Sequence, residues 1–313
     1  MNSVGIDVSK GKSMIAVMRP FGEVVCSPFE VPHTSSELSA LARRLKSLDG
    51  ETRVVMEATG NYHLPVAQAL HDAGLYVSVV NAKLVHAYGN NELRRVKTDR
   101  KDAVKLANYG LDRWLSLPRY IPEENTRLLL KNCYRQYQQG CKVQTMQKNN
   151  LVSLLDTTFP NANRLFRSPA RADGSEKWVD FVAEFWHCEC IRECSEKAFM
   201  TKYQRWCKKQ GYNYREEKAR SIYSEACGCV GVMPKSSTTK LLVKQVVSQL
   251  KATSSALAAL KQEMQALAAQ LPEYPVVMGM FGVGPTLGPQ LMAEIGDVRR
   301  FHSKKSPRGL RRH

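Results

Sequence analysis

The segment VGIDVS, residues 4–9, decides the fold because it is a short apolar strand that carries a carboxylate, Asp7, near its centre. Side chains alternate between the two faces of a strand, so Ile6 and Val8 point away from the face that presents Asp7. A carboxylate on an apolar strand is costly to bury unless it is paired or binds a metal ion. This segment therefore predicts a sheet and a candidate functional residue together.

Strands and helices follow one another on the carboxyl-terminal side of this segment. MIAVM (14–18) and VVCSPFEV (24–31) read as strands, with a turn at Pro20-Phe21-Gly22, so the first three strands predict an antiparallel meander. Thr34 or Ser35 is placed to cap a helix over 35–48. Further strands are expected at TRVVMEATG (52–60) and LYVSVVN (75–81), with helices over 62–73 and 99–112. This order predicts an α/β fold in which helices cover a mixed sheet.

The chain becomes helical from about residue 123, and residues 156–235 show no sustained period. A heptad pattern then marks 240–271. Its first core position is occupied by Val243, Leu250, Leu257, Met264 and Leu271, and its second by Val246, Thr253, Leu260 and Leu267, of which only Thr253 is polar. Such a seam predicts either a coiled coil between chains or an amphipathic core helix. We therefore expect a first domain over 1–150, a helical linker and coiled coil over 151–271, and a partial helical domain over 272–313.

The carboxyl-terminal region combines a glycine turn with a basic tail. FGVGPTLGPQLMAEIGD (281–297) resembles a helix–hairpin–helix element, in which backbone N–H groups face a phosphate, although a plain loop and helix has the same pattern. The stretch from Arg299 to His313 is strongly basic and lacks an apolar period. We expect this stretch to act as a phosphate-binding arm.

The composition favours a polyanionic partner. Lys and Arg number 46 against 29 Asp and Glu, a net charge of +17, and such an excess supplies sequence-independent affinity for nucleic acid. The sequence shows neither a signal peptide nor an apolar run of about 18 residues, which favours a cytoplasmic protein without a membrane span. The nine cysteines are then expected to be free thiols. The spacing of Cys188, Cys190 and Cys194 near His187 is a weak zinc pattern, so no zinc is assigned.

Three further carboxylates accompany Asp7. Glu57 closes the strand RVVME, and Asp99 and Asp102 share one helix face in KTDRKDA. Asp99 and Asp102 alone have the pattern of a solvated charged face. Together, however, four carboxylates are suited to bind Mg²⁺ ions that hold a phosphodiester during an in-line displacement. The basic residues expected to bind the nucleic-acid backbone are Arg94, Arg95, Lys97, Arg100, Lys101, Arg299, Arg300, Lys304 and Lys305.

These residues lie in segments that resemble the DEDD class of insertion-sequence transposases, also known as bridge recombinases. The matching segments are GIDVSK (5–10), MEATGNY (56–62), KTDRKDA (97–103) and GVGPTLGPQLMAEIGDVRRF (282–301). The resemblance implies a RuvC/RNase H-like fold and metal binding by Asp7, Glu57, Asp99 and Asp102. It also implies DNA strand exchange directed by a structured guide RNA, in a homo-oligomer.

The sequence departs from that family at its end. Transposases of this class carry a nucleophilic serine in a serine-glycine motif, and no counterpart is found here, since Ser303 and Ser306 lie too early to match it. The expectation is a truncated chain whose full recombination activity is doubtful. A catalytically inactive nucleic-acid-binding remnant is the alternative. A sugar kinase or actin-like ATPase also opens with a segment like Gly5-Ile6-Asp7, but the basic Asp-x-x-Asp motif is not expected there.

Overall fold

The computed structural model describes residues 1–88 and 98–300, the side chain of Arg300 excepted. The chain divides into two compact units, Met1–Pro122 and Glu123–His313. The sequence predicts a first domain over 1–150. Position 150 lies instead inside one continuous helix, α5 (Asn125–Thr158), which belongs to the second unit.

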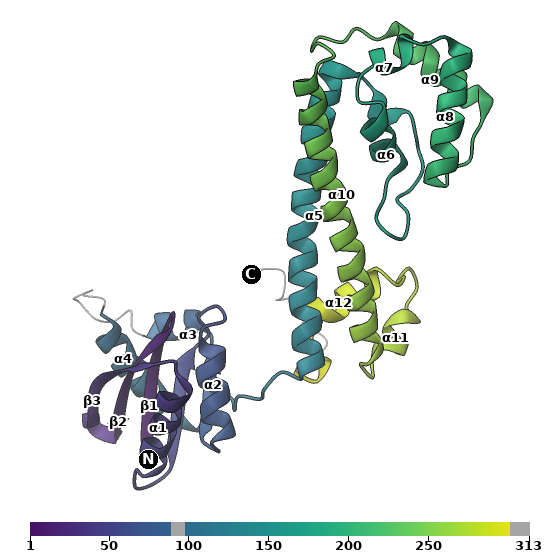
Figure 1. Ribbon diagram of the computed structural model, residues 1–313. Helices are drawn as coiled ribbons and strands as arrows, with labels where there is room; N and C mark the ends of the chain where they lie inside the picture. Colours follow the sequence, from purple (N-terminus) through teal and green to yellow (C-terminus); the bar gives the residue numbers. More distant parts are fainter. Residues whose placement is uncertain (89–97, 301–313) are drawn as a thin grey trace. The chain divides into compact units, whose positions relative to one another are not determined.

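The first unit is built on a five-stranded mixed sheet (Figure 1). The strands β1 (Asn2–Ser9), β2 (Lys12–Arg19), β3 (Glu23–Pro32), β4 (Thr52–Glu57) and β5 (Tyr76–Val80) lie in the order β3-β2-β1-β4-β5. The pairs β1–β2 and β2–β3 are antiparallel, whereas β1–β4 and β4–β5 are parallel. The short helical turn η1 (Pro20–Gly22) joins β2 to β3. The predicted meander and the α/β class are confirmed.

Helices cover both faces of this sheet. Val4, Ile6 and Val8 of β1 belong to a core that also contains residues of α1 (Ser35–Lys46) and α2 (His63–Asp72). The side chain of Thr34 accepts a hydrogen bond from the Glu37 amide at 3.3 Å and so caps α1 as predicted. The opposite face is covered by α3 (Ala82–Tyr88), α4 (Asp99–Asp112) and the turn η2 (Trp114–Ser116), around a second core that includes Val55, Val80, Val85 and Leu106.

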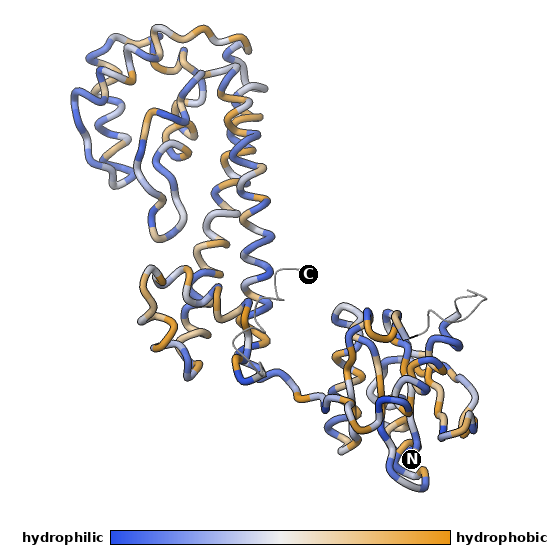
Figure 2. Tube along the Cα trace, turned by 180° about the vertical axis from the view of Figure 1, so that it is seen from behind, coloured by the Kyte–Doolittle hydropathy of each residue, from blue (hydrophilic) through white to orange (hydrophobic). Residues whose placement is uncertain are grey.

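The second unit is organised by a long helical hairpin. The helix α10 (Ser237–Ala269) packs antiparallel along α5, so that Leu130 shares a core with Met264 and Gln144 Nε2 donates to Ser254 Oγ at 2.9 Å (Figure 1). A Cβ on Gly140 would lie 2.7 Å from Leu257 Cδ2, so glycine permits this close approach. Hydrophobic and hydrophilic residues alternate along both helices (Figure 2). The predicted seam therefore packs against α5 of the same chain.

A small helical domain connects the two long helices at one end of the hairpin. It contains η3 (Ala162–Arg164), α6 (Lys177–Glu184), α7 (Glu189–Arg192), α8 (Glu196–Gln210) and α9 (Glu216–Gly228). Its core is a cluster of aromatic rings that includes Phe181, Phe185, Phe199, Tyr203 and Trp206. We call this region, residues 159–236, the tip domain.

At the other end of the hairpin lie α11 (Tyr274–Met278), α12 (Leu287–Ile295) and η4 (Val298–Arg300). Met292 and Ala293 of α12 pack against Leu130 and Met264 of the hairpin. At the start of α12 the Gly288 amide donates to the Gly284 carbonyl at 2.9 Å, so this N–H group is used within the turn. Within the described part of the chain, no helix has the length and apolar character needed to cross a membrane.

Candidate metal-dependent active site

Two of the predicted carboxylates lie on neighbouring strands at the same edge of the sheet. The parallel register pairs Ile6 of β1 with Met56 of β4, so the next residues along the two strands are Asp7 and Glu57. Carboxyl ends of parallel strands meet at one edge of a sheet, where ligands of α/β folds commonly bind. The backbone therefore positions Asp7 beside Glu57, although 50 residues separate them in the sequence.

The helix α4 packs unusually close to β1. A Cβ on Gly5 would lie 2.0 Å from the Ala103 carbonyl oxygen and 2.3 Å from the Ala107 amide nitrogen. A Cβ on Gly110 would lie 2.3 Å from Ser3 Oγ. Ser3 therefore faces the end of α4 and Gly5 its middle, which means that α4 runs antiparallel to β1.

This direction determines where the first turn of α4 lies. Two strand residues span about 6.6 Å, which corresponds to roughly 4.4 residues of an α-helix. Moving from Gly5 to Asp7 along β1 therefore corresponds to moving from Ala103 and Ala107 to the start of α4, where Asp99 and Asp102 lie. The hydroxyl of Thr98 accepts a hydrogen bond from the Lys101 amide at 3.3 Å and fixes this start.

The side chains at this end of the sheet do not form a ready-made metal site. Among residues 1–88 and 98–300, no three His, Cys, Asp or Glu side chains are grouped closely enough to hold a metal ion. The backbone arrangement nevertheless brings Asp7, Glu57 and the first turn of α4 to one end of the sheet. Oxygen donors of this kind suit Mg²⁺ rather than a soft metal ion.

A lysine and a glutamate flank this region on the meander. Lys12 Nζ lies 2.7 Å from Glu30 Oε2, and Glu30 raises the pKa of Lys12, with a further contribution from Asp99. Lys12 and Asp99 are therefore electrostatic neighbours, which associates the first turn of α4 with the β1–β2 hairpin. The sequence motifs gave no indication that Lys12 belongs to this region.

Comparison with known proteins gives the family. A family model described as a transposase of the DEDD type matches residues 4–160, just over half of the 313 residues. The chain belongs to the DEDD transposase family. The matched residues contain GIDVSK, MEATGNY and KTDRKDA, so the family resemblance drawn from these motifs is confirmed.

Curated relatives of this family member include two pilin gene-inverting proteins. The pilin gene-inverting protein of Moraxella bovis is 26% identical over 150 residues, which are 46% of this chain and 43% of that protein. The pilin gene-inverting protein of Moraxella lacunata is 26% identical over 134 residues, 43% and 38% of the two chains. The matched part is therefore less than half the length of either relative.

Among solved structures, RuvC of T. thermophilus in complex with a Holliday junction substrate is similar to this family member. The match covers 39% of this chain and 99% of that chain, with 14% sequence identity and a TM-score of 0.29.

The predicted nucleic-acid-binding residues have different outcomes in this DEDD family member. Arg100 and Lys101 are exposed in the first turn of α4, beside the candidate site. Arg299 is bound to its neighbour Asp297, with Nη2 2.8 Å from Oδ2 and Nε 3.0 Å from Oδ1, and this lowers the pKa of Asp297 to about 2. The remaining predicted side chains lie outside the described residues: Arg94, Arg95, Lys97, Arg300, Lys304 and Lys305.

Two polar groups that the sequence motifs do not indicate lie just beyond Glu57. Within residues 1–88 and 98–300, Thr59 Oγ1 and His63 Nδ1 are buried atoms without a hydrogen-bond partner. Burial lowers the pKa of His63, and the nearby backbone of Thr59 and Gly60 opposes part of this shift. The segment TGNYH (59–63), which follows the strand-ending Glu57, contains both residues and is the signal that could have indicated them, but a turn and a helix start have the same composition.

The cysteine-rich segment has a structural explanation. His187 Nδ1 accepts from the Glu189 amide at 3.1 Å, so Nε2 carries the proton and donates to the Met233 carbonyl at 3.0 Å. Both ring nitrogens of this buried histidine are therefore occupied by backbone groups. All nine cysteines are free thiols in the structure.

Proposed function

We propose that this chain is the transposase of an insertion sequence and that it catalyses DNA strand exchange at a carboxylate site formed by Asp7, Glu57, Asp99 and Asp102. The observation that supports this assignment is the close packing of α4 on Gly5, which brings the first turn of α4 to the strand ends that carry Asp7 and Glu57. Membership of the DEDD transposase family supports the same four residues.

The donor set fits Mg²⁺ in its chemistry, because all four residues offer carboxylate oxygens and none offers sulfur. The side chains must rotate toward one another to act together, since no three of them are grouped as they stand in the described residues. When bound, the metal supplies positive charge that offsets the charge developing on a phosphodiester during displacement. The four carboxylates would hold it, and Arg100 and Lys101 would orient the nucleic-acid backbone beside it.

DNA is the proposed substrate, and a structured guide RNA and further copies of the chain are the proposed partners. The net charge of +17 supports a nucleic-acid partner. The guide RNA and the homo-oligomer are proposed from the family resemblance. RNA that copurifies with the full chain, released by phenol and sequenced, tests the first, and light scattering with and without that RNA tests the second.

Strand cleavage tests the catalytic proposal. The full chain is incubated with supercoiled plasmid that carries the element ends, in Mg²⁺, Mn²⁺ or EDTA. We expect nicked or joined products only with metal, and a loss of at least 100-fold in rate for Asp7→Asn. The matched control is Glu37→Gln, which removes an exposed carboxylate from the first turn of α1 and is expected to retain the wild-type rate.

The second candidate function is that of a nucleic-acid-binding protein without catalysis, and the absence of a grouped metal site among the described side chains favours it. Salt-dependent DNA or RNA binding with no cleavage in any metal would select this function over the transposase. ATP hydrolysis without nucleic acid would instead support the kinase or ATPase interpretation.

A further inference from the structure

The tip domain of the second unit contains a hollow of about 730 Å³ that is distant in sequence from the carboxylates. It is bounded by the loop 165–171, the start of α6, the loop 211–215 and the start of α9. We call it the basic hollow. Its lining lies beyond residue 160, where the family match ends.

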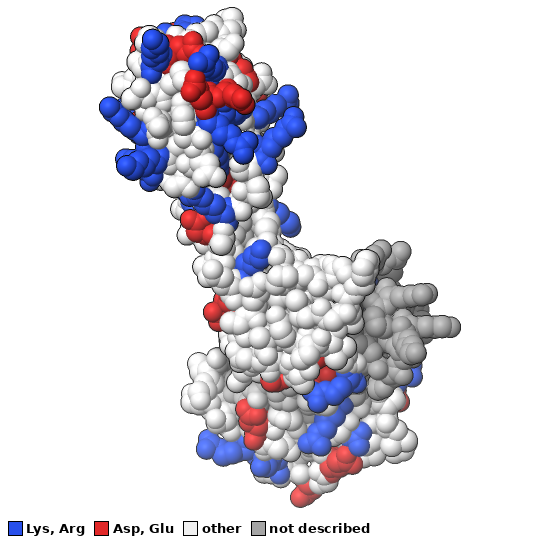
Figure 3. All heavy atoms as spheres, turned by 90° about the vertical axis from the view of Figure 1, so that its right-hand side faces the viewer, with Lys and Arg blue, Asp and Glu red and all other residues white. Residues whose placement is uncertain are grey.

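Cations dominate the lining of the basic hollow. It contains five of them, Arg167, Arg171, Lys177, Arg215 and Lys218, and a single carboxylate, that of Glu217. None of the five cations forms an ion pair with a carboxylate in the described part of the chain. Lys and Arg side chains also gather on the tip domain in the space-filling view (Figure 3). The lining therefore carries a local charge of about +4, from five cations and one anion.

Three of these cations lie against aromatic rings that also line the hollow. Lys177 Nζ lies 4.9 Å from the centre of the Phe166 ring and 5.0 Å from that of Tyr212. Lys218 Nζ lies 5.6 Å from the Phe166 ring, and the Arg171 guanidinium lies 3.9 Å from the Tyr212 ring. Cation–π contacts of this kind hold cations without neutralising them. Their charge thus remains available to an anion that enters the hollow.

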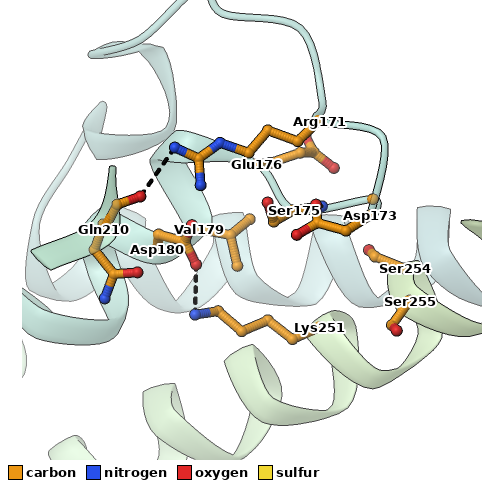
Figure 4. A pocket seen from close by; sticks show the side chains of 11 residues that line it. Arg171, Asp173, Ser175, Glu176, Val179, Asp180, Gln210, Lys251, Ser254 and Ser255 are labelled. Atoms are coloured by element: carbon orange, nitrogen blue, oxygen red, sulfur yellow. Dashed lines mark hydrogen bonds and ion pairs between the residues drawn. The ribbon is translucent and has the colours of Figure 1, made fainter. Parts of the chain in front are cut away.

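Neighbouring groups fix this arrangement before any ligand binds. The Tyr212 hydroxyl donates to Asp180 Oδ2 at 2.6 Å, while Lys251 Nζ of α10 lies 2.5 Å from Asp180 Oδ1. Arg171 Nη2 donates to the carbonyls of Gln210 and Gly211, each at 2.9 Å. Figure 4 shows Arg171 with Gln210 and Asp180 with Lys251, in an adjoining pocket that shares Arg171 with the basic hollow. The cationic surface is therefore preorganised.

The cations of the basic hollow repel one another, which affects the pKa of Lys177. Burial lowers the pKa of Lys177, and Lys218, Arg171 and Arg215 lower it further. A bound polyanion would relieve this repulsion, because each phosphate places negative charge among like-charged side chains.

We propose that the basic hollow binds the phosphate backbone of a single-stranded nucleic acid, with phosphates at Lys177 and Lys218 and a base stacked on the side of the Arg171 guanidinium that does not face Tyr212. The volume is that of a pocket that encloses a ligand of nucleotide size, whereas a duplex is too wide to enter it. Single strands are commonly held by a cationic groove together with planar groups that stack on bases. RNA and DNA share this backbone chemistry, and the experiment distinguishes them.

Binding by the full chain tests the proposal. Fluorescence anisotropy with a labelled single-stranded 20-mer, as RNA and as DNA, is measured in EDTA over a series of salt concentrations. The double variant Lys177→Gln/Lys218→Gln is expected to bind at least one of the two at least 10-fold more weakly at about 0.1 M salt. Its slope of log affinity against log salt should fall by about 1.4, since each phosphate contact on a single strand contributes about 0.7.

The matched control is Lys208→Gln/Lys209→Gln, which removes the same charge from two exposed lysines of α8 that do not line the hollow. It is expected to change affinity less than 2-fold. Equal losses in the two double variants, or no loss in either, would overturn the proposal. A thermal unfolding curve for each variant separates weaker binding from loss of folding.

Amine labelling gives a local readout that does not depend on variants. Lys177 and Lys218 should be protected from an amine-reactive reagent by the 20-mer, as mapped by mass spectrometry, while Lys208 and Lys209 remain reactive. Protection by RNA alone or DNA alone identifies the ligand. Protection by inorganic triphosphate but by neither 20-mer would contradict a nucleic-acid site.

Discussion

A Cβ atom on Gly5 would lie 2.0 Å from the carbonyl oxygen of Ala103, so the strand β1 and the helix α4 are in direct backbone contact at this point. Any other residue at position 5 must push α4 away from the sheet. The first turn of α4 carries Asp99 and Asp102, and β1 carries Asp7 two residues further along. The spacing of the candidate carboxylates therefore depends on a glycine that bears no functional group.

The first prediction concerns Gly5→Ala. We expect the substitution to destabilise the first unit by about 2 kcal/mol, because overpacking a tight core contact typically costs about 1–3 kcal/mol. Metal-dependent cleavage should decrease more than stability alone explains, since the carboxylates move apart. Urea unfolding followed by circular dichroism measures the stability. Gly228→Ala is the control, because a Cβ there meets nothing within 4 Å, and an equal effect of the two variants would contradict the role of Gly5.

The second prediction concerns metal binding without catalysis. Mn²⁺ at a tenfold excess over its dissociation constant should stabilise the wild-type first unit by about 1.4 kcal/mol. That corresponds to roughly 5 °C in melting temperature. Asp7→Asn should lose most of this increase, measured against the melting temperature of the same variant in EDTA, because it removes a proposed metal ligand. An unchanged metal response in Asp7→Asn, with the response of Glu37→Gln also unchanged, would exclude Asp7 as a ligand.

The third prediction concerns the buried pair between Arg127 and Glu273, which joins the start of α5 to the residues after α10. Arg127 Nη2 lies 3.0 Å from Glu273 Oε2, and the Arg127 side chain is only 5% exposed. Glu273→Ala should destabilise the second unit by about 3 kcal/mol, because it leaves a buried cation with less compensation. Urea unfolding monitored by tryptophan fluorescence measures this loss.

The matched control for this pair is Glu216→Ala, which removes the partner of Arg220 in an exposed ion pair on α9. We expect no measurable change, because water screens exposed pairs. Arg127 also lowers the pKa of Glu273, so the contribution of the pair is present above the ordinary pKa of a glutamate and is lost as the pH falls through the lowered value. If Glu216→Ala destabilises the second unit as much as Glu273→Ala does, burial of the ion pair does not explain its contribution to stability.

The fourth prediction concerns mild acid. Burial lowers the pKa of both His33 and His63 in the first unit. A histidine with a lowered pKa binds its proton more readily in the unfolded chain, so its contribution to stability is complete above about pH 6.5 and is lost as the pH falls through the folded-state pKa. The melting temperature of the first unit should therefore fall between about pH 7 and pH 5.

Replacing His63, which is half-buried, tests the cause of this acid sensitivity. His63→Gln should flatten the pH dependence, whereas His86→Gln, at an exposed position in α3, should leave it unchanged. If both variants keep the wild-type pH profile, His63 does not contribute to it.

The sequence by itself determined the elements of the first unit and the family. Alternation of apolar residues and the turn at Pro20-Phe21-Gly22 predicted the meander, and the predicted helix over 99–112 is confirmed by α4. These features are readable because they depend on neighbours in the chain. Ordered motifs likewise identified Asp7, Glu57, Asp99 and Asp102 as candidates, since their residue types carry the chemistry.

Only the tertiary structure decided which distant groups meet. The register of β1 against β4 and the contact of Gly5 with Ala103 bring the candidate carboxylates to one end of the sheet. Likewise, only the structure shows that the heptad residues of α10 pack against α5 of the same chain. The basic hollow joins residues around 166 with residues around 215, in a stretch that has no sustained period. Such sites form because burial of aromatic side chains folds the chain back on itself, and no local pattern records which cations that folding brings together.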